Sequence, residues 1–195
     1  MSGMKPGELL GLTAACRRMY ESGLVTGALG GVGVRVSSGD VMVSRAGSRL
    51  GFLQDTDMIL MNGVRQQPDG KREGYTRDAG IFKAVLAVRK EAGSVIRIQS
   101  PYATALAHRG RKAMEKSQGL MEDLGGVVFV PFYRQGTAGL AGAVAEALRD
   151  NRIAIVEGQG PVLWGIDIED AVDQAEALEA AAKVIFLLNG GNGAG

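Results

Sequence analysis

The sequence predicts an α/β fold in which helices cover both faces of a sheet that contains some antiparallel pairs. Segments with apolar residues at helical spacing are mixed along the chain with short apolar strands, an order typical of a layered α/β protein. Two alternating segments, residues 31–37 and 40–44, are joined by Ser38-Gly39 and indicate a β-hairpin. The hairpin accounts for the antiparallel pairs.

Length and composition place the chain among single-domain proteins. It has 195 residues, 46% hydrophobic and 22% charged, and its net charge of +1 favours neither a nucleic acid nor a membrane surface as partner. No apolar run reaches the roughly 18 residues that span a bilayer, and the first residues lack the apolar segment of a signal peptide. We therefore expect a cytoplasmic protein without a membrane partner.

The elements follow from local patterns. Leu9, Leu12 and Cys16 share one face of an amphipathic first helix, so the single cysteine is expected to be a buried structural residue. In chain order we expect a helix at 8–22, the hairpin, a strand at 58–61, a long exposed loop at 62–74, a helix that follows Thr76 and Asp78, a strand at 95–98, a helix at 102–117, a strand at 127–131, a helix from Thr137 to Arg149, strands at 153–157 and 161–164, and a last helix at 167–188.

The helix starts carry recognisable capping residues. Thr76 or Asp78 can cap the second helix, and Thr137 can cap the helix that follows it. The last helix begins with Asp167, Glu169 and Asp170, whose charges suit the positive end of the helix dipole. We interpret these three carboxylates as capping groups and not as catalytic ones.

The predicted strand at 95–98 is unusual because it carries Arg97, with Gln99 directly after it. A Ser100-Pro101 break then opens the next helix. An unpaired charge among apolar residues is costly. The pattern therefore predicts that Arg97 meets either an acidic partner or an anionic ligand.

Five segments follow one another along the chain: YESGLVTGALGG, SRAGSRLGFLQDTDMILM, SPYATALA after a strand, VPFYRQGTAGLAGAVAEAL, and IVEGQGPVLWGIDIEDAVDQAEALE. Together and in this order they resemble the class II aldolase/adducin family, from Glu8 to about Leu188. We expect one domain at 1–188. The tail at 189–195, NGGNGAG, has nothing to bury and is expected to be disordered.

The resemblance implies a three-layer α/β/α fold with a central, mainly antiparallel sheet. It also implies a homo-oligomer, commonly a four-fold tetramer with its sites between neighbouring protomers. Sugar-phosphate aldolases, epimerases, a dehydratase, decarboxylases and the non-enzymatic head of adducin share this fold. The fold alone therefore cannot name a reaction.

The resemblance also implies where a metal would bind. In the family's metal enzymes, two histidines on the strand before SPYA and a third in an Asn-His-Gly turn hold zinc. Here these positions carry Arg97, Gln99 and Gln159. A guanidinium has no lone pair to give to a metal ion and carries a repelling charge. We therefore predict no bound metal and no other cofactor.

Other family positions are changed as well. The family's catalytic glutamate, which follows two phosphate-binding hydroxyl residues, matches Asp78 after Thr76-Arg77. The tyrosine that follows Val-Pro in several aldolases matches Phe132, with Tyr133 next to it. The only histidine, His108, lies beyond the SPYA segment and is expected to be exposed or hydrogen-bonded.

Two hypotheses remain open from the sequence. In the first, the pocket is rebuilt for a small carboxylate or phosphate ligand and supports a metal-independent lyase step: decarboxylation, dehydration or carbon–carbon cleavage. Asp78 would move a proton and Arg97 would stabilise charge as the catalytic pair. Four further residues would bind the substrate: Arg77, Gln99, Gln159 and Tyr133.

In the second hypothesis the protein is a catalytically inactive pseudo-aldolase. Arg97 then pairs with Asp78 and fills the space that the metal occupies in the family's enzymes. The protein would serve as a binding or structural subunit, or as the partner of an active homologue.

Overall fold

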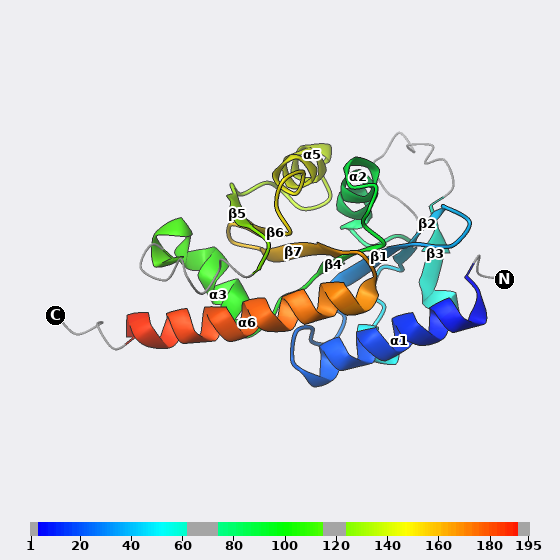
Figure 1. Ribbon diagram of the computed structural model, residues 1–195, viewed down its shortest axis with the longest axis horizontal. Helices are drawn as coiled ribbons and strands as arrows, with labels where there is room; N and C mark the ends of the chain where they lie inside the picture. The colour runs from blue at the N-terminus through cyan, green and yellow to red at the C-terminus, as the bar shows by residue number, and fades with distance from the viewer. Residues whose placement is uncertain (1–3, 62–73, 115–123, 191–195) are drawn as a thin grey trace.

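One seven-stranded sheet forms the centre of the molecule (Figure 1). The computed structural model describes residues 4–61, 74–114 and 124–190. The strand order is β3-β2-β1-β4-β7-β6-β5, and every neighbouring pair is antiparallel except β5 with β6. The strands are β1 (Gly31–Arg35), β2 (Val41–Ser44), β3 (Met58–Leu60), β4 (Ser94–Arg97), β5 (Val127–Val130), β6 (Ile153–Val156) and β7 (Gly160–Gly165).

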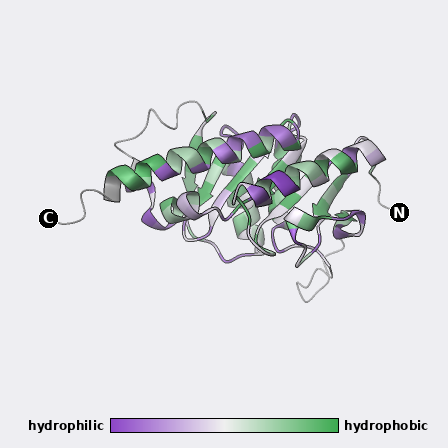
Figure 2. Ribbon diagram, turned by 90° about the horizontal axis from the view of Figure 1, so that it is seen from below, coloured by the Kyte–Doolittle hydropathy of each residue, from purple (hydrophilic) through white to green (hydrophobic). Residues whose placement is uncertain are grey.

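Helices cover both faces of this sheet. On one face lie α2 (Ala79–Val88) and α5 (Ala138–Ala147), and on the other lie α1 (Pro6–Glu21), α3 (Pro101–Arg109) and α6 (Ile168–Gly190) (Figure 1). Figure 2 views the second layer from outside, with hydrophilic segments on the two long helices and largely hydrophobic strands behind them. The three-layer α/β/α prediction and the mainly antiparallel sheet are confirmed.

The core is divided by the sheet into two clusters. Ile96 belongs to the cluster under α1, α3 and α6, whereas Val95 belongs to the cluster under α2 and α5. Side chains alternate between the faces of a strand, so Arg97 lies on the same face as Val95. The register of β4 thus directs the arginine toward α2.

Cys16 is fully buried in the first cluster, as its place on the apolar helix face predicts. Burial raises the pKa of its thiol to about 12. The thiolate is therefore scarce near neutral pH, and the structural interpretation of this cysteine is confirmed. Within the described residues, no helix combines the length and the apolar character that crossing a membrane requires.

Several helix boundaries differ from the prediction: α1 begins at Pro6, two residues early, and α5 ends at Ala147, two residues early. The helix expected at 102–117 ends at Arg109, because Gly110 adopts a left-handed φ of 71° and a short 3-10 helix, Arg111–Met114, follows. At the other end of the chain, α6 continues to Gly190 and so includes the first two residues of the predicted tail. Residues 191–195 and nearly all of the predicted loop at 62–74 lie outside the described residues.

The capping predictions have mixed outcomes. Thr137 accepts a hydrogen bond from the backbone N–H of Leu140, 3.2 Å away, and Asp167 accepts one from the backbone of Asp170, 2.8 Å away. These two caps are confirmed. Asp78 occupies the N-cap position of α2 but its side chain caps nothing. Its carboxylate turns instead toward Arg97.

Candidate active site

Arg97 is the most buried charged side chain of the structure, at 1% exposure. It ends β4, where it lies opposite Gly31 of β1 on one side and Val162 of β7 on the other. A guanidinium in the middle of a sheet must find acceptors close by. The N-terminus of α2 and the turn before β7 supply them.

The acceptors of Arg97 come from Asp78 and Gln159. Nη1 of Arg97 donates to Oδ1 of Asp78 at 2.8 Å, which makes a buried ion pair. Nη2 donates to Oε1 of Gln159 at 3.2 Å and to its backbone oxygen at 3.4 Å. Gln159 in turn donates from Nε2 to the backbone oxygen of Tyr133. One polar chain therefore links α2, β4, the turn before β7 and the segment after β5.

Burial changes the protonation of Asp78. The pKa of the Asp78 carboxyl is raised, chiefly because burial disfavours its charged form. The guanidinium of Arg97, and more weakly that of Arg77, act in the opposite direction and offset only part of the effect. Asp78 thus holds its proton to a higher pH than an exposed aspartate does.

A cleft of about 370 Å³ opens beside the ion pair. It is hereafter the first cleft, and its wall is formed by the turns at 28–30 and 46–47, by residues 76–78, and by Arg97, Gln99 and Gln135. Gly30 has a φ of 96°, and a Cβ there would lie 2.9 Å from the backbone oxygen of Arg97. Only glycine allows this turn to pass so closely over the end of β4.

A second cleft of about 600 Å³ adjoins the first. It is lined by Arg77, Phe132, Arg134, Gln135, Gly158 and Gln159. Arg77 and Gln135 line both clefts, so the two clefts are direct neighbours. The second cleft reaches the polar chain through Gln159.

The sequence and the fold are both similar to those of known proteins. The family model of the Class II Aldolase and Adducin N-terminal domain matches residues 11–186. This chain belongs to that family. The sequence-based resemblance is thereby confirmed over almost the whole described chain.

Individual relatives catalyse several reactions. The chain is 26% identical to the 3-oxo-tetronate 4-phosphate decarboxylase of Haemophilus influenzae over 179 residues, 89% of this chain and 84% of that protein. It is 27% identical to the methylthioribulose-1-phosphate dehydratase of Gluconobacter oxydans over 180 residues, 86% of each. The l-fuculose-1-phosphate aldolase from Thermus thermophilus superposes with a TM-score of 0.79 at 20% identity, covering 98% of this chain and 100% of that one. At this identity the structural likeness shows the fold alone.

The structure brings five of the six predicted site residues together. Arg77, Asp78, Arg97 and Gln99 line the first cleft, and Gln159 joins Arg97 to the second. Tyr133 is different, because only its backbone oxygen takes part, while its ring lies beside Gly139 of α5. His108 is exposed, as expected.

Sequence reasoning did not single out Arg134 and Gln135. Both are exposed residues of the segment that follows β5, and both line the second cleft. Their signal in the sequence was their place directly after Val-Pro-Phe-Tyr, at the end of a strand. Such loop residues have no periodic pattern, so only the fold could bring them to the site.

The residues at the family's metal position do not fit a zinc ion. Arg97 donates hydrogen bonds there and offers no lone pair, and the amide oxygen of Gln159 already accepts one. Within the described parts of the chain, no three His, Cys, Asp or Glu side chains lie close enough to hold a metal ion. The chemistry of the donor set argues against zinc at this position.

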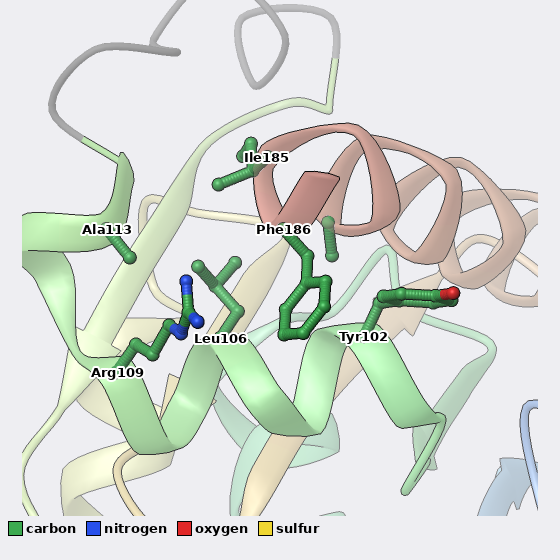
Figure 3. A pocket seen from close by; sticks show the side chains of 7 residues that line it. Tyr102, Leu106, Arg109, Ala113, Ile185 and Phe186 are labelled. Carbon is green, nitrogen blue, oxygen red and sulfur yellow. The ribbon is translucent and has the colours of Figure 1, made fainter. Parts of the chain in front are cut away.

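A further cavity, between α3 and α6, is too small for a ligand (Figure 3). Its volume is about 10 Å³, room for about one water molecule. The ring of Phe186 fills the space, with Arg109 stacked 4.8 Å from its centroid and Tyr102 packed edge-on at 5.6 Å. This region is packed helix interface and not a binding site.

Proposed function

We propose that this protein is a metal-independent lyase-type enzyme that acts on a small phosphorylated substrate in the first cleft. One observation carries the proposal. Arg97, although almost fully buried, lines an open cleft, and its hydrogen bonds to Asp78 and Gln159 number three, whereas a guanidinium has five N–H donors. The ion pair with Asp78 therefore does not use all the donors of this arginine.

The reaction class follows from what Arg97 and Asp78 offer. Decarboxylation of a 3-oxo acid, dehydration of a hydroxy ketone and aldol cleavage all place negative charge on a carbonyl oxygen in the transition state. A buried guanidinium beside that oxygen stabilises the charge by hydrogen bonds in a water-poor site. Asp78, whose pKa is raised by burial, gives or takes the proton at carbon.

Decarboxylation illustrates the roles. The bond to the substrate carboxylate breaks, carbon dioxide leaves, and the electron pair moves to form the enolate whose oxygen Arg97 stabilises. A proton from Asp78 then adds to the carbon, and solvent returns a proton to the carboxylate. No step requires a metal ion.

The rest of the first cleft suits a phosphate group. The turns at 28–30 and 46–47, Thr76 and Arg77 line one opening. Backbone N–H groups, a hydroxyl and a guanidinium are the donors that bind phosphate oxygens. The decarboxylase and dehydratase relatives are named for phosphorylated carbonyl compounds, which supports the same substrate class.

Turnover by chelator-treated protein tests this proposal. The substrates are 3-oxo-tetronate 4-phosphate, methylthioribulose-1-phosphate and L-fuculose phosphate, the compounds for which the relatives are named. We expect turnover of at least one, reduced by about 10²–10⁴-fold in Asp78→Asn because the proton donor is lost. Asp170→Asn, which removes the carboxylate of another arginine pair, is the matched control. Turnover that appears only after zinc is added would contradict the proposal.

A pseudo-aldolase is the second candidate, and the polar chain favours it. Asp78, Arg97 and Gln159 hydrogen-bond to one another and are each at most 7% exposed, so each of these buried side chains has a partner without a bound ligand. Under this alternative the protein binds and converts none of the three compounds. A thermal-shift titration with each of them separates the two candidates, because binding to the folded state alone raises the melting temperature.

We also propose that the protein is a homo-oligomer, as the family resemblance implies, with a tetramer as the expected form. The end of α6 supports this, because Leu187 and Leu188 are about 60% exposed there. In the alternative, a homologous partner subunit covers the end of α6. Light scattering on the purified chain gives its mass in solution, and a monomer would contradict the self-assembly proposal.

A further inference from the structure

We infer that the ligand of this site carries two anionic groups, a phosphate in the first cleft and a carboxylate held by Arg134 in the second. The inference rests on the proposed function, since it specifies the substrate class for the same opening. It assigns a role to Arg134 and to the second cleft, neither of which the proposed reaction uses.

The two clefts of the site lie next to each other. Arg77 and Gln135 belong to both walls, and the two clefts have volumes of about 370 and 600 Å³. Arg97 lines the first cleft and donates to Gln159, which lines the second. In the inferred pose, the ligand has its reacting carbonyl at Arg97 and one end in each cleft.

The charges on the two walls do not balance. The charged side chains on the two walls are Arg77, Arg97, Arg134 and Asp78. Arg97 and Asp78 form an ion pair, whereas Arg77 and Arg134 are exposed and make no salt bridge within the described residues. Two unpaired guanidinium groups at one opening attract anions and repel each other until anions bind.

The residues that line each cleft indicate which cleft binds the phosphate and which binds the carboxylate. The first cleft offers tight turns and the Thr76 hydroxyl, donors that converge on a tetrahedral phosphate. The second offers the planar fork of Arg134, the amide side chain of Gln135 and the exposed ring of Phe132. A planar guanidinium fork matches a planar carboxylate.

A matched pair of probes tests the inference. Glycerol 3-phosphate and 3-phosphoglycerate differ only in a hydroxymethyl group that is replaced by a carboxylate. Calorimetric titration of chelator-treated full-length protein should show 3-phosphoglycerate binding at least about tenfold more tightly, since a charged hydrogen-bonded contact is worth about 1.4 kcal/mol or more. Arg134→Gln should remove this preference and change the glycerol 3-phosphate affinity by less than about twofold.

Arg149→Gln is the control for loss of a surface charge. Arg149 follows α5, pairs with Glu146 and lines neither cleft, so this variant should keep the preference. Equal affinity of the wild type for both probes, or an equal loss of both in Arg134→Gln, overturns the inference and leaves the proposed function standing. Failure of the wild type to bind either probe overturns both.

Discussion

Two arginine–aspartate pairs in this molecule have the same chemistry and different surroundings. Arg97 and Asp78 join β4 to α2, whereas Arg152 and Asp170 join the start of β6 to the first turn of α6. The side chains of the first pair are 1% and 11% exposed, and those of the second are 23% and 25% exposed. Only the more deeply buried pair lines either of the two clefts.

The second pair has a structural explanation for each of its contacts. The guanidinium of Arg152 stacks 4.6 Å from the ring centroid of Trp164 and donates to the backbone oxygen of that residue. Asp170 accepts from Arg152 and from the backbone N–H of Ile166, which fixes the chain where α6 begins. Arg152 also keeps a buried donor without a partner, its Nε, so neither burial nor an unused donor separates the two pairs. The comparison teaches that an ion pair indicates a site when it lines an opening, as only Arg97 and Asp78 do.

The largest expected effect is on stability at the buried pair. Arg97→Met should lower the free energy of unfolding by about 3–5 kcal/mol, because Asp78 is left buried without its partner. The double variant Arg97→Met, Asp78→Leu should regain most of the loss, since an apolar pair needs no counter-charge. Urea unfolding measures both. A loss below about 1 kcal/mol in the single variant would show that the pair is not coupled as the structure has it.

A smaller effect is expected at the partly buried pair of Arg152 and Asp170. Arg152→Met should lower the free energy of unfolding by about 1–2 kcal/mol, because solvent screens the pair while the stacking on Trp164 is lost. The same urea titration provides the measurement. A cost equal to that of Arg97→Met would remove the contrast between the two pairs.

The pH dependence of stability is the smallest of these effects. The pKa of Asp78 is raised in the folded state, so the folded protein binds this proton more tightly than the unfolded chain does. The resulting contribution to the free energy of unfolding is fully present below the ordinary aspartate pKa. It is lost as pH rises through the raised pKa. The Asp78→Asn variant lacks the titratable carboxyl group at this position. The wild type should therefore lose stability relative to Asp78→Asn as pH rises across this window. A relative gain would mean that Arg97 outweighs burial and lowers the pKa.

Much of this architecture follows from the sequence for physical reasons. Helical spacing of apolar residues and the Ser38-Gly39 turn define most elements, and the cost of burying a lone guanidinium predicts a partner for Arg97. The sequence left open whether that partner is an acid or a ligand. The structure supplies Asp78, and the open cleft beside the pair leaves room for a ligand as well.

What could not be predicted depends on three-dimensional context. The end of α3 was misplaced because apolar and basic residues continue past Gly110, and only its left-handed φ ends the helix there. The parallel pairing of β5 with β6 has no local signal, since both strands are short apolar runs. Arg134 and Gln135 reach the site through a loop whose path the residue pattern does not determine.

Affinity for a phosphorylated acid, compared between variants of the two pairs, tests the central claim most directly. Titration of chelator-treated wild type, Arg97→Lys and Arg152→Lys with 3-phosphoglycerate keeps the charge at each position and removes the guanidinium fork. We predict an affinity at least about tenfold weaker in Arg97→Lys, and within about twofold of the wild type in Arg152→Lys. Equal affinity in all three proteins would contradict the assignment of Arg97 to a ligand-binding site.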